Sequence, residues 1–344
     1  MANVKLFPCM IFDAICLLDL FDKDSPYQRP EQKAFREKIN KLTSGKLYKG
    51  YIGMWGLCNK ISEYDKSGKI ENYTLDDLAE YFLKPEYIKE ELLNHKIWVS
   101  NDDFSPEDWI DKYLNYINIL KEIKFDKLWE SDLMPVIQEV INNRQDKYNR
   151  YNFDCVFADI QKLKQSEPLE DIKIFISVMI CPTAFKICGN SFVDNVISNN
   201  IDVNIGVLFH ELMHGFAFAN AELEGLYLEY INSINYLKKQ HDILINELGS
   251  GNEEEFVVAA EYYLRMKHNN EDKVEILRED WKNDGRRCMP TSVLLFDLLS
   301  KENETPDGYA KWLIDVFKNK RLPQDAIEYH LDCIFKNNFR IGDA

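Results

Sequence analysis

Two histidines and a glutamate stand together in the run Val207–Phe216, which reads VLFHELMHGF. His210 and His214 are four residues apart, so on a helix both imidazoles leave the same face and can share one cation. Glu211 lies between them, where a carboxylate can accept a proton from a metal-bound water. Zinc suits such a site because three protein ligands leave a fourth position open for water. The spacing therefore predicts a helical zinc site with His210 and His214 as ligands and Glu211 as the catalytic base.

The residues around this motif are apolar. Apart from Glu211, no acidic residue, Lys or Arg occurs between Val203 and Ala219. This composition indicates a buried helix, and a buried helix rarely carries two histidines and a glutamate without partners. The alternative is a core helix whose histidines make ordinary hydrogen bonds. In that case His210→Ala would cost packing stability and change no bound metal.

Composition limits the classes of partner. The 344 residues, of which 45% are hydrophobic, suffice for a sizeable core. The formal net charge is -16. It argues against nucleic acid or an anionic membrane as the main partner, because both would on average repel the chain. No window is long enough and sufficiently free of charge to span a membrane.

The N-terminus and the cysteines indicate a cytoplasmic protein. The opening run MANVKLFPCMIFDAICLLDL has no basic start and no small-residue cleavage site. It predicts a packed first helix or strand and not a signal peptide. The eight cysteines are scattered without a C-x-x-C pair, and most have apolar neighbours. This pattern indicates buried cysteines with free thiols. The alternative is a secreted protein in which the cysteines form disulfides.

Most of the chain is expected to be helical, with strands in one central stretch. Helices are predicted in the first 150 residues from starts near Pro30, Thr74, Pro85, Ser105 and Phe125. After Pro168 the pattern changes. Residues 172–180 are β-branched and partly alternating, which predicts a strand, and 184–188 and 191–201 predict two shorter ones. A sheet edge just before the metal helix would be able to take an extended peptide by backbone hydrogen bonds.

A run of acidic residues follows the metal helix. After a break at Gly249-Ser250-Gly251-Asn252, three glutamates, Glu253, Glu254 and Glu255, begin a helix that turns apolar from Phe256 onward. Favourable placement against the helix dipole would by itself explain three acids at a helix start. A carboxylate on the buried side of this helix nevertheless needs a cation, and the zinc site needs a third protein ligand. All three glutamates are candidates on this argument.

With VLFHELMHGF and NEEEFVVAAEYYL, the sequence resembles the zincin metallopeptidases over about residues 170–265. It is most similar to the gluzincin branch, in which a glutamate from a later helix completes the zinc site. The metzincin branch is disfavoured because its pattern needs Gly and His where this chain has Ala217 and Asn220. Aligning the family pattern of an acid followed by apolar, apolar and small residues selects Glu255 as the third ligand. Glu254 is the nearest rival, and Glu253 comes third.

The sequence departs from the thermolysin-like subgroup at one position. That subgroup has an Asp four residues after the ligand glutamate, oriented toward a zinc histidine, whereas this chain has Ala259. An acceptor for the zinc histidine must therefore come from elsewhere in the chain or from a backbone carbonyl.

The helix and strand signals together predict an α+β fold, mainly α, with a small sheet before the HExxH helix. Helical N- and C-terminal regions are expected to form a zincin-like cleft. The expected domains are a helical N-terminal region over residues 1–150 and a metallopeptidase domain with a helical C-terminal part over residues 151–344. A single domain is the alternative.

The resemblance also implies a zinc-dependent peptidase with one zinc per chain and a peptide or protein substrate. Related enzymes add a Tyr, His or Arg to stabilise the oxyanion, and the candidates here are Tyr262, Tyr263, Arg286, Arg287 and His330. One alternative is a catalytically silent protein of the same fold that binds a peptide or protein partner. The intact Glu211 argues against it. Another is a helical scaffold without metal.

Overall fold

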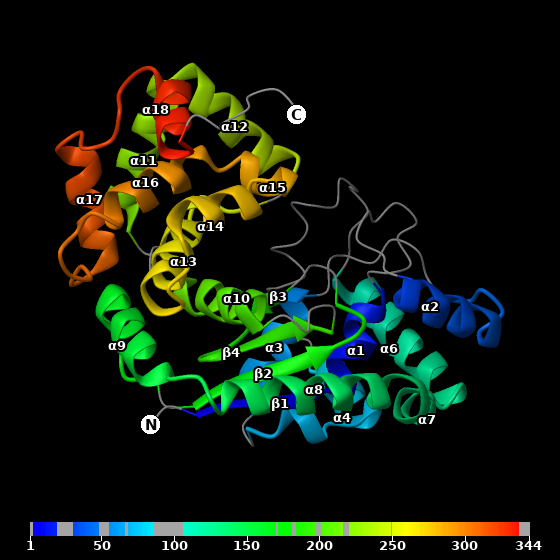
Figure 1. The fold of residues 1–344 in the computed structure, drawn as a ribbon. Coiled ribbons are helices and arrows are strands. Elements are labelled where there is room, and N and C mark those ends of the chain that lie inside the picture. The colour runs from blue at the N-terminus through cyan, green and yellow to red at the C-terminus, as the bar shows by residue number, and fades with distance from the viewer. Residues whose placement is uncertain are drawn as a thin grey trace. The chain divides into compact units, whose positions relative to one another are not determined.

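The computed structural model describes residues 3–18, 30–47, 55–65, 68–84, 106–169, 171–180, 184–196, 201–215, 220–248 and 250–336. Within them lie mainly helices and one four-stranded sheet, which confirms the expected α+β, mainly α class (Figure 1). The helix predicted from Pro85 lies outside the described residues.

The elements alternate between long helical stretches and short strands. Those of the first 196 residues are β1 (Asn3–Pro8), α1 (Met10–Cys16), α2 (Pro30–Leu42), α3 (Trp55–Tyr64), η2 (Ile70–Asn72), α4 (Leu75–Phe82), α6 (Pro106–Glu122), α7 (Phe125–Leu128), η4 (Trp129–Leu133), α8 (Met134–Tyr148), α9 (Phe153–Lys164), β2 (Asp171–Ser177), β3 (Ala184–Lys186) and β4 (Ser191–Asn195). The remaining elements are α10 (Ile201–Met213), α11 (Ala221–Ser233), α12 (Asn235–Asn246), α13 (Glu254–His268), α14 (Lys273–Asp280), α15 (Asp284–Arg287), α16 (Pro290–Leu299), α17 (Tyr309–Lys318) and α18 (Ile327–Ile334).

The chain divides into two compact units. One, the sheet unit, consists of Asn3–Tyr151 and Asp171–Ile201; the other, the α13 unit, contains Asn152–Glu170 and Asp202–Ala344. The chain passes between them near residues 151, 170 and 201. The domain boundary expected near residue 150 lies where the chain first leaves the sheet unit, after Tyr151. The strand segment from Asp171, however, was expected in the second domain and belongs with the N-terminal helices.

The sheet has the strand order β1-β2-β4-β3. β1, β2 and β4 run parallel, and β3 pairs antiparallel with β4. The strands expected at residues 172–180, 184–188 and 191–201 are found as β2, β3 and β4, with the last ending at Asn195. Helix α8 packs against β1 and β2 (Figure 1), and α1 packs against β2 and α3. The central strands therefore bury both the even and the odd positions, as parallel strands covered by helices do.

A buried carboxylate ties the elements of the sheet unit together. Asp13 of α1 is 0% exposed. Its Oδ1 accepts hydrogen bonds from the Ser177 hydroxyl at 2.6 Å and from the backbone N–H groups of Val178 and Met179 at 2.9 Å each. Its Oδ2 accepts from Trp129 Nε1 at 2.7 Å. These bonds join α1 to the end of β2 and to the π-helical segment η4, so the carboxylate is fully engaged in holding the fold.

Helix α13 forms the core of the α13 unit. Every residue from Glu255 to Leu264 is buried, and the helix packs against α9, α14 and α16. A helix that is buried all round lies at the centre of its unit, because each face has a neighbour to cover it. The acidic start of α13 is thereby held inside the protein, where a carboxylate needs partners.

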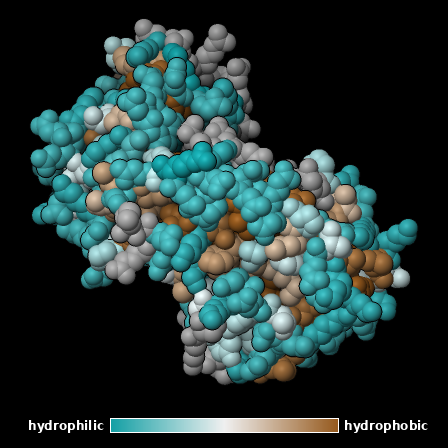
Figure 2. Space-filling view, turned by 60° about the horizontal axis from the view of Figure 1, so that its bottom comes forward, coloured by the Kyte–Doolittle hydropathy of each residue, from teal (hydrophilic) through white to brown (hydrophobic). Residues whose placement is uncertain are grey.

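The face shown in Figure 2 is mostly hydrophilic, with smaller hydrophobic areas between the polar residues. In the described part of the chain, no helix is both long and apolar enough to cross a membrane. The cysteines in that part are free thiols. Cys9, Cys16 and Cys58 are buried, whereas Cys155 and Cys333 are exposed. The sequence predicted that most of the thiols are buried, and among the described cysteines this is true of Cys9, Cys16 and Cys58.

Candidate metal centre

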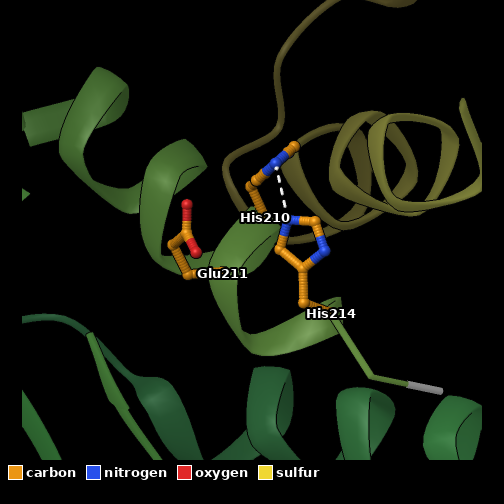
Figure 3. A group of neighbouring side chains, drawn as sticks. All are labelled: His210, Glu211 and His214. Atoms are coloured by element: carbon orange, nitrogen blue, oxygen red, sulfur yellow. Dashed lines mark hydrogen bonds between the residues drawn. The ribbon is translucent and has the colours of Figure 1, made fainter. Parts of the chain in front are cut away.

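Helix α10 presents the HExxH residues beside a buried apolar stripe. Ile205, Leu208, Phe209, Leu212 and Met213 recur at helical spacing and are all at most 2% exposed. They fix one face of α10 in the core. The adjoining positions then carry the two imidazoles on one side of the helix, with Glu211 leaving the same turn beside them (Figure 3). The ligand atoms of these three residues lie within 4.8 Å of one another.

The C-terminal end of α10 is held by a lysine from α9. Lys164 Nζ donates to the carbonyl oxygens of Leu212 and His214 at 2.6 and 2.8 Å. Carbonyls at the C-terminal end of a helix generally lack an intrahelical donor, and a cation there also complements the helix dipole. Gly215 follows with φ +86, a left-handed conformation that ends a helix easily only with glycine. Lys164 and Gly215 thus fix where the second histidine lies.

Each histidine is held through Nδ1 by a buried carboxylate of the α13 segment. Glu261 Oε2 lies 3.1 Å from His210 Nδ1, and Glu253 Oε1 lies 2.8 Å from His214 Nδ1. A carboxylate only accepts, so Nδ1 of each ring carries the hydrogen. Carboxylate–histidine pairs of this kind fix ring orientation at metal sites and raise the basicity of the ligand nitrogen.

The two remaining nitrogens face each other. His210 Nε2 and His214 Nε2 are 3.2 Å apart (Figure 3). With Nδ1 protonated on both neutral rings, both Nε2 atoms present lone pairs, and two lone pairs at this distance repel unless a cation lies between them. The arrangement therefore favours positive charge at this point, as a proton or as a metal ion.

Glu254 completes a three-residue set. Its Oε1 lies 3.2 Å from His210 Nε2, and its Oε2 lies 3.8 Å from His214 Nε2. Tetrahedral ligands at the usual zinc distances are separated from one another by about 3.3 Å. The spacing of the nitrogen and oxygen atoms matches that value, and two histidines with one carboxylate are a donor set that zinc accepts. His210, His214 and Glu254 therefore fit a zinc ion.

The structure turns Glu255, the residue that the sequence favours as third ligand, toward Thr291 and Tyr227. Glu255 is 1% exposed, and its carboxyl faces another part of the core. Oε1 accepts from the backbone N–H of Thr291 at 2.8 Å, and Oε2 accepts from the Tyr227 hydroxyl, which also contacts His241 Nδ1. Consecutive residues of a helix point about 100° apart. The Glu254 carboxylate therefore lies beside the histidines, while that of Glu255, the next residue, points away from them.

Two arginines surround Glu261. Arg286 Nη2 donates to Oε2 at 3.0 Å, the oxygen that also meets His210, and Arg265 Nη1 donates to Oε1 at 3.3 Å. Burial by itself would raise the pKa of Glu261, but the nearby charge of Arg286 and the contact with His210 outweigh it and lower that pKa. Glu261 is thus kept ionised and able to accept from His210.

The electrostatics of the ligand residues agree with a cation site. Burial opposes the charged form of His210, but the charge of Glu254 and hydrogen bonds with Glu254 and Glu261 raise the pKa of His210 to about 10. Burial also raises the pKa of Glu254, and the charge of His210 outweighs this and brings the pKa to about 2. A carboxylate that stays ionised beside two imidazoles stabilises any cation bound between them.

Most of the residues considered for the oxyanion are engaged elsewhere. Tyr262 is buried and packs against Phe296, and the Tyr263 hydroxyl meets Thr305 Oγ1 at 3.0 Å. Arg286 holds Glu261, and its Nη1 is buried.

The last two candidates have other surroundings. Arg287 donates to the carbonyls of Trp281 and Lys282, and His330 lines a surface cavity of about 400 Å³ beside α16 and α18. Among these candidates, Arg286 contacts the histidine site through Glu261.

Sequence reasoning missed Glu261 and Lys164. Glu261 stands inside the buried run of α13, where an acidic residue among apolar neighbours is a signal of a partner. Lys164 is the last residue of α9, and nothing in its neighbouring sequence indicates a contact with residues 48 and 50 positions later.

Searches against models of protein families, curated proteins and solved structures find no match to this chain. Any function assigned to this chain therefore depends on its residues and their geometry.

Proposed function

We propose that this protein is a zinc-dependent metallopeptidase of the zincin type, with zinc held by His210, His214 and Glu254. The observation that carries the proposal is the convergence of the two Nε2 atoms and one carboxylate of Glu254 at 3.2 to 3.8 Å. The match of these spacings to a tetrahedral zinc site supports it.

Glu253 and Glu261 act as orienting groups. Each holds one histidine by Nδ1, so that Nε2 is the nitrogen left for the metal. Both lie on or next to α13, which also supplies Glu254. The segment of α13 therefore positions Glu253, Glu254 and Glu261, and α10 carries the other groups of the site. A rigid support of this kind keeps ligand atoms in place between turnovers.

Glu211 is the proton carrier. Bound zinc would polarise a water molecule and bring its pKa near neutrality. The Glu211 carboxylate takes the proton as the water oxygen attacks the carbonyl carbon of a peptide bond. It then gives that proton to the departing amine nitrogen, so atoms and charges balance over the hydrolysis. Glu211 is only 5% exposed, which limits the water around its carboxylate.

Glu211→Gln tests this role. The amide keeps the size of the side chain but cannot accept the proton, so the variant should retain zinc and lose at least about 100-fold in turnover. The assay is cleavage of a mixed peptide library, followed by mass spectrometry, with zinc content measured on the same samples. Wild-type cleavage should stop with a chelator and return with zinc.

Each other outcome has a distinct meaning. Undiminished hydrolysis by Glu211→Gln contradicts the assignment of the base. A wild-type chain that holds zinc but cleaves no peptide favours the alternative of a silent zincin-type protein that binds a peptide or protein partner. A folded chain that takes up no zinc favours the scaffold without metal.

A further inference from the structure

A glycine inside α10 faces the carboxylate that holds His210. Gly206 lies one helical turn before His210 and is buried. A Cβ at this position would lie 3.3 Å from Arg265 Cδ and 3.4 Å from Glu261 Oε1. Glycine disfavours a helix interior relative to alanine, because it loses more backbone freedom on folding. Here the space left by the missing side chain is filled by the Arg265 and Glu261 side chains.

Arg265 cannot easily move out of this space. Its Nη2 donates to Glu271 at 2.8 Å, and its Nη1 lies 3.4 Å from Asp280 and 3.3 Å from Glu261. Its side chain is 12% exposed. A methyl group at position 206 would therefore press on a side chain that several carboxylates hold in place. The displacement would pass to Glu261, which Arg265 holds by Oε1.

We propose that Gly206 is a positioning residue of the zinc site. Its missing side chain forms a notch in α10, defined by Gly206, Arg265 and Glu261. The notch leaves room for the Arg265 side chain, which holds Glu261 by Oε1 while Oε2 of the same carboxylate holds His210 by Nδ1. The inference rests on the proposed zinc site and adds to it a residue that neither binds metal nor touches substrate.

Gly206→Ala and Gly225→Ala form a matched pair for the test. Both glycines lie inside helices, and a Cβ on Gly225 of α11 would meet nothing within 4 Å. Both substitutions favour the helix intrinsically, but only the first disturbs the notch. The measurement is the zinc dissociation constant, from competition with a chromophoric chelator. Circular dichroism of the zinc-free proteins checks that each variant folds.

Gly206→Ala should raise the zinc dissociation constant about tenfold, because disturbing outer carboxylate partners of metal ligands has effects of this order. Gly225→Ala should leave it within about twofold of wild type. In a background of Arg265→Ala the same Gly206→Ala change should cost much less, because the side chain that the methyl group meets is gone. Such a smaller cost would show that the methyl group acts through Arg265 and not through a general disturbance of α10.

If wild type binds zinc and the two glycine variants bind it with equal affinity, the inference that Gly206 positions the zinc site is wrong. A wild type that binds no zinc removes the proposed function as well, so the two failures are distinguishable. If Gly206→Ala does not fold, Glu261→Asp gives a second test. It keeps the charge but withdraws the oxygen from His210, and it should also raise the dissociation constant about tenfold. An unchanged value would contradict the inference.

Discussion

Replacing Glu255 with Gln removes a buried charge without changing the shape of the side chain. Burial raises the pKa of Glu255 to about 7 from an ordinary value of 4.5, although hydrogen bonds from Tyr227 and Thr291 oppose the rise. The folded chain therefore holds this proton more tightly than the unfolded chain does. A raised carboxyl pKa means that wild-type stability decreases as the pH rises from about 4.5 through about 7.

The size of the effect follows from the two pKa values. At pH 8 ionisation of Glu255 costs about 3 kcal/mol relative to a group that does not titrate, and at pH 5 the cost is below about 1 kcal/mol. Gln does not titrate. Its carbonyl oxygen can accept from Thr291 N–H, and its amide can donate to the Tyr227 hydroxyl, which then donates to His241 Nδ1. Between pH 5 and pH 8 the free energy of unfolding of the variant should rise by about 2 to 3 kcal/mol relative to that of wild type.

Urea unfolding of both proteins at pH 5 and pH 8, with a chelator present, measures this difference. The chelator removes any contribution from bound metal, and titrations common to both chains cancel in the comparison. A variant that is less stable than wild type at pH 8 would refute the reasoning. It would show that Glu255 is ionised in the folded protein and that its charge has a favourable partner.

Two further substitutions test the supports of each unit. Asp13→Ala removes the shared acceptor of four buried donors, of which Met179 N–H keeps a second acceptor in Ser177 Oγ, so we expect a loss of about 3 kcal/mol or more in the free energy of unfolding of the sheet unit, measured by urea denaturation; a loss below about 1 kcal/mol would contradict it. Lys164→Met removes two charge-assisted hydrogen bonds from the end of α10, so thermal unfolding should show a loss of about 1 to 2 kcal/mol. Unchanged stability would show that water satisfies these carbonyls equally well.

The HExxH helix and the strands were predictable because their signals are local. The apolar residues around His210 have helical spacing, and the β-branched run from Ile172 marks a strand by its composition alone. The strand order was not predictable, because β1 pairs with a strand about 170 residues later. No periodicity within either segment encodes that pairing.

The third ligand shows where sequence reasoning about the site reaches its limit. A pattern of acid, apolar, apolar and small residues selects Glu255, because a frame starting at Glu254 would place the acidic Glu255 at an apolar position. The choice depends on which carboxylate Thr291 and Tyr227 hold away from the histidines, and both come from distant segments. Glu261 has a local signal, an acidic residue within a buried run, but its partner Arg286 is 25 residues away, so the sequence does not indicate which groups it meets.

Zinc content per chain is the measurement that tests the central claim most directly. Wild type, Glu254→Gln and Glu255→Gln would be purified without added metal, and zinc would be measured by atomic emission. The geometry predicts about one zinc in wild type and in Glu255→Gln, and a clear loss in Glu254→Gln. Loss of zinc from Glu255→Gln with retention in Glu254→Gln would contradict the ligand set, and folded wild type that takes up no zinc would contradict the site itself.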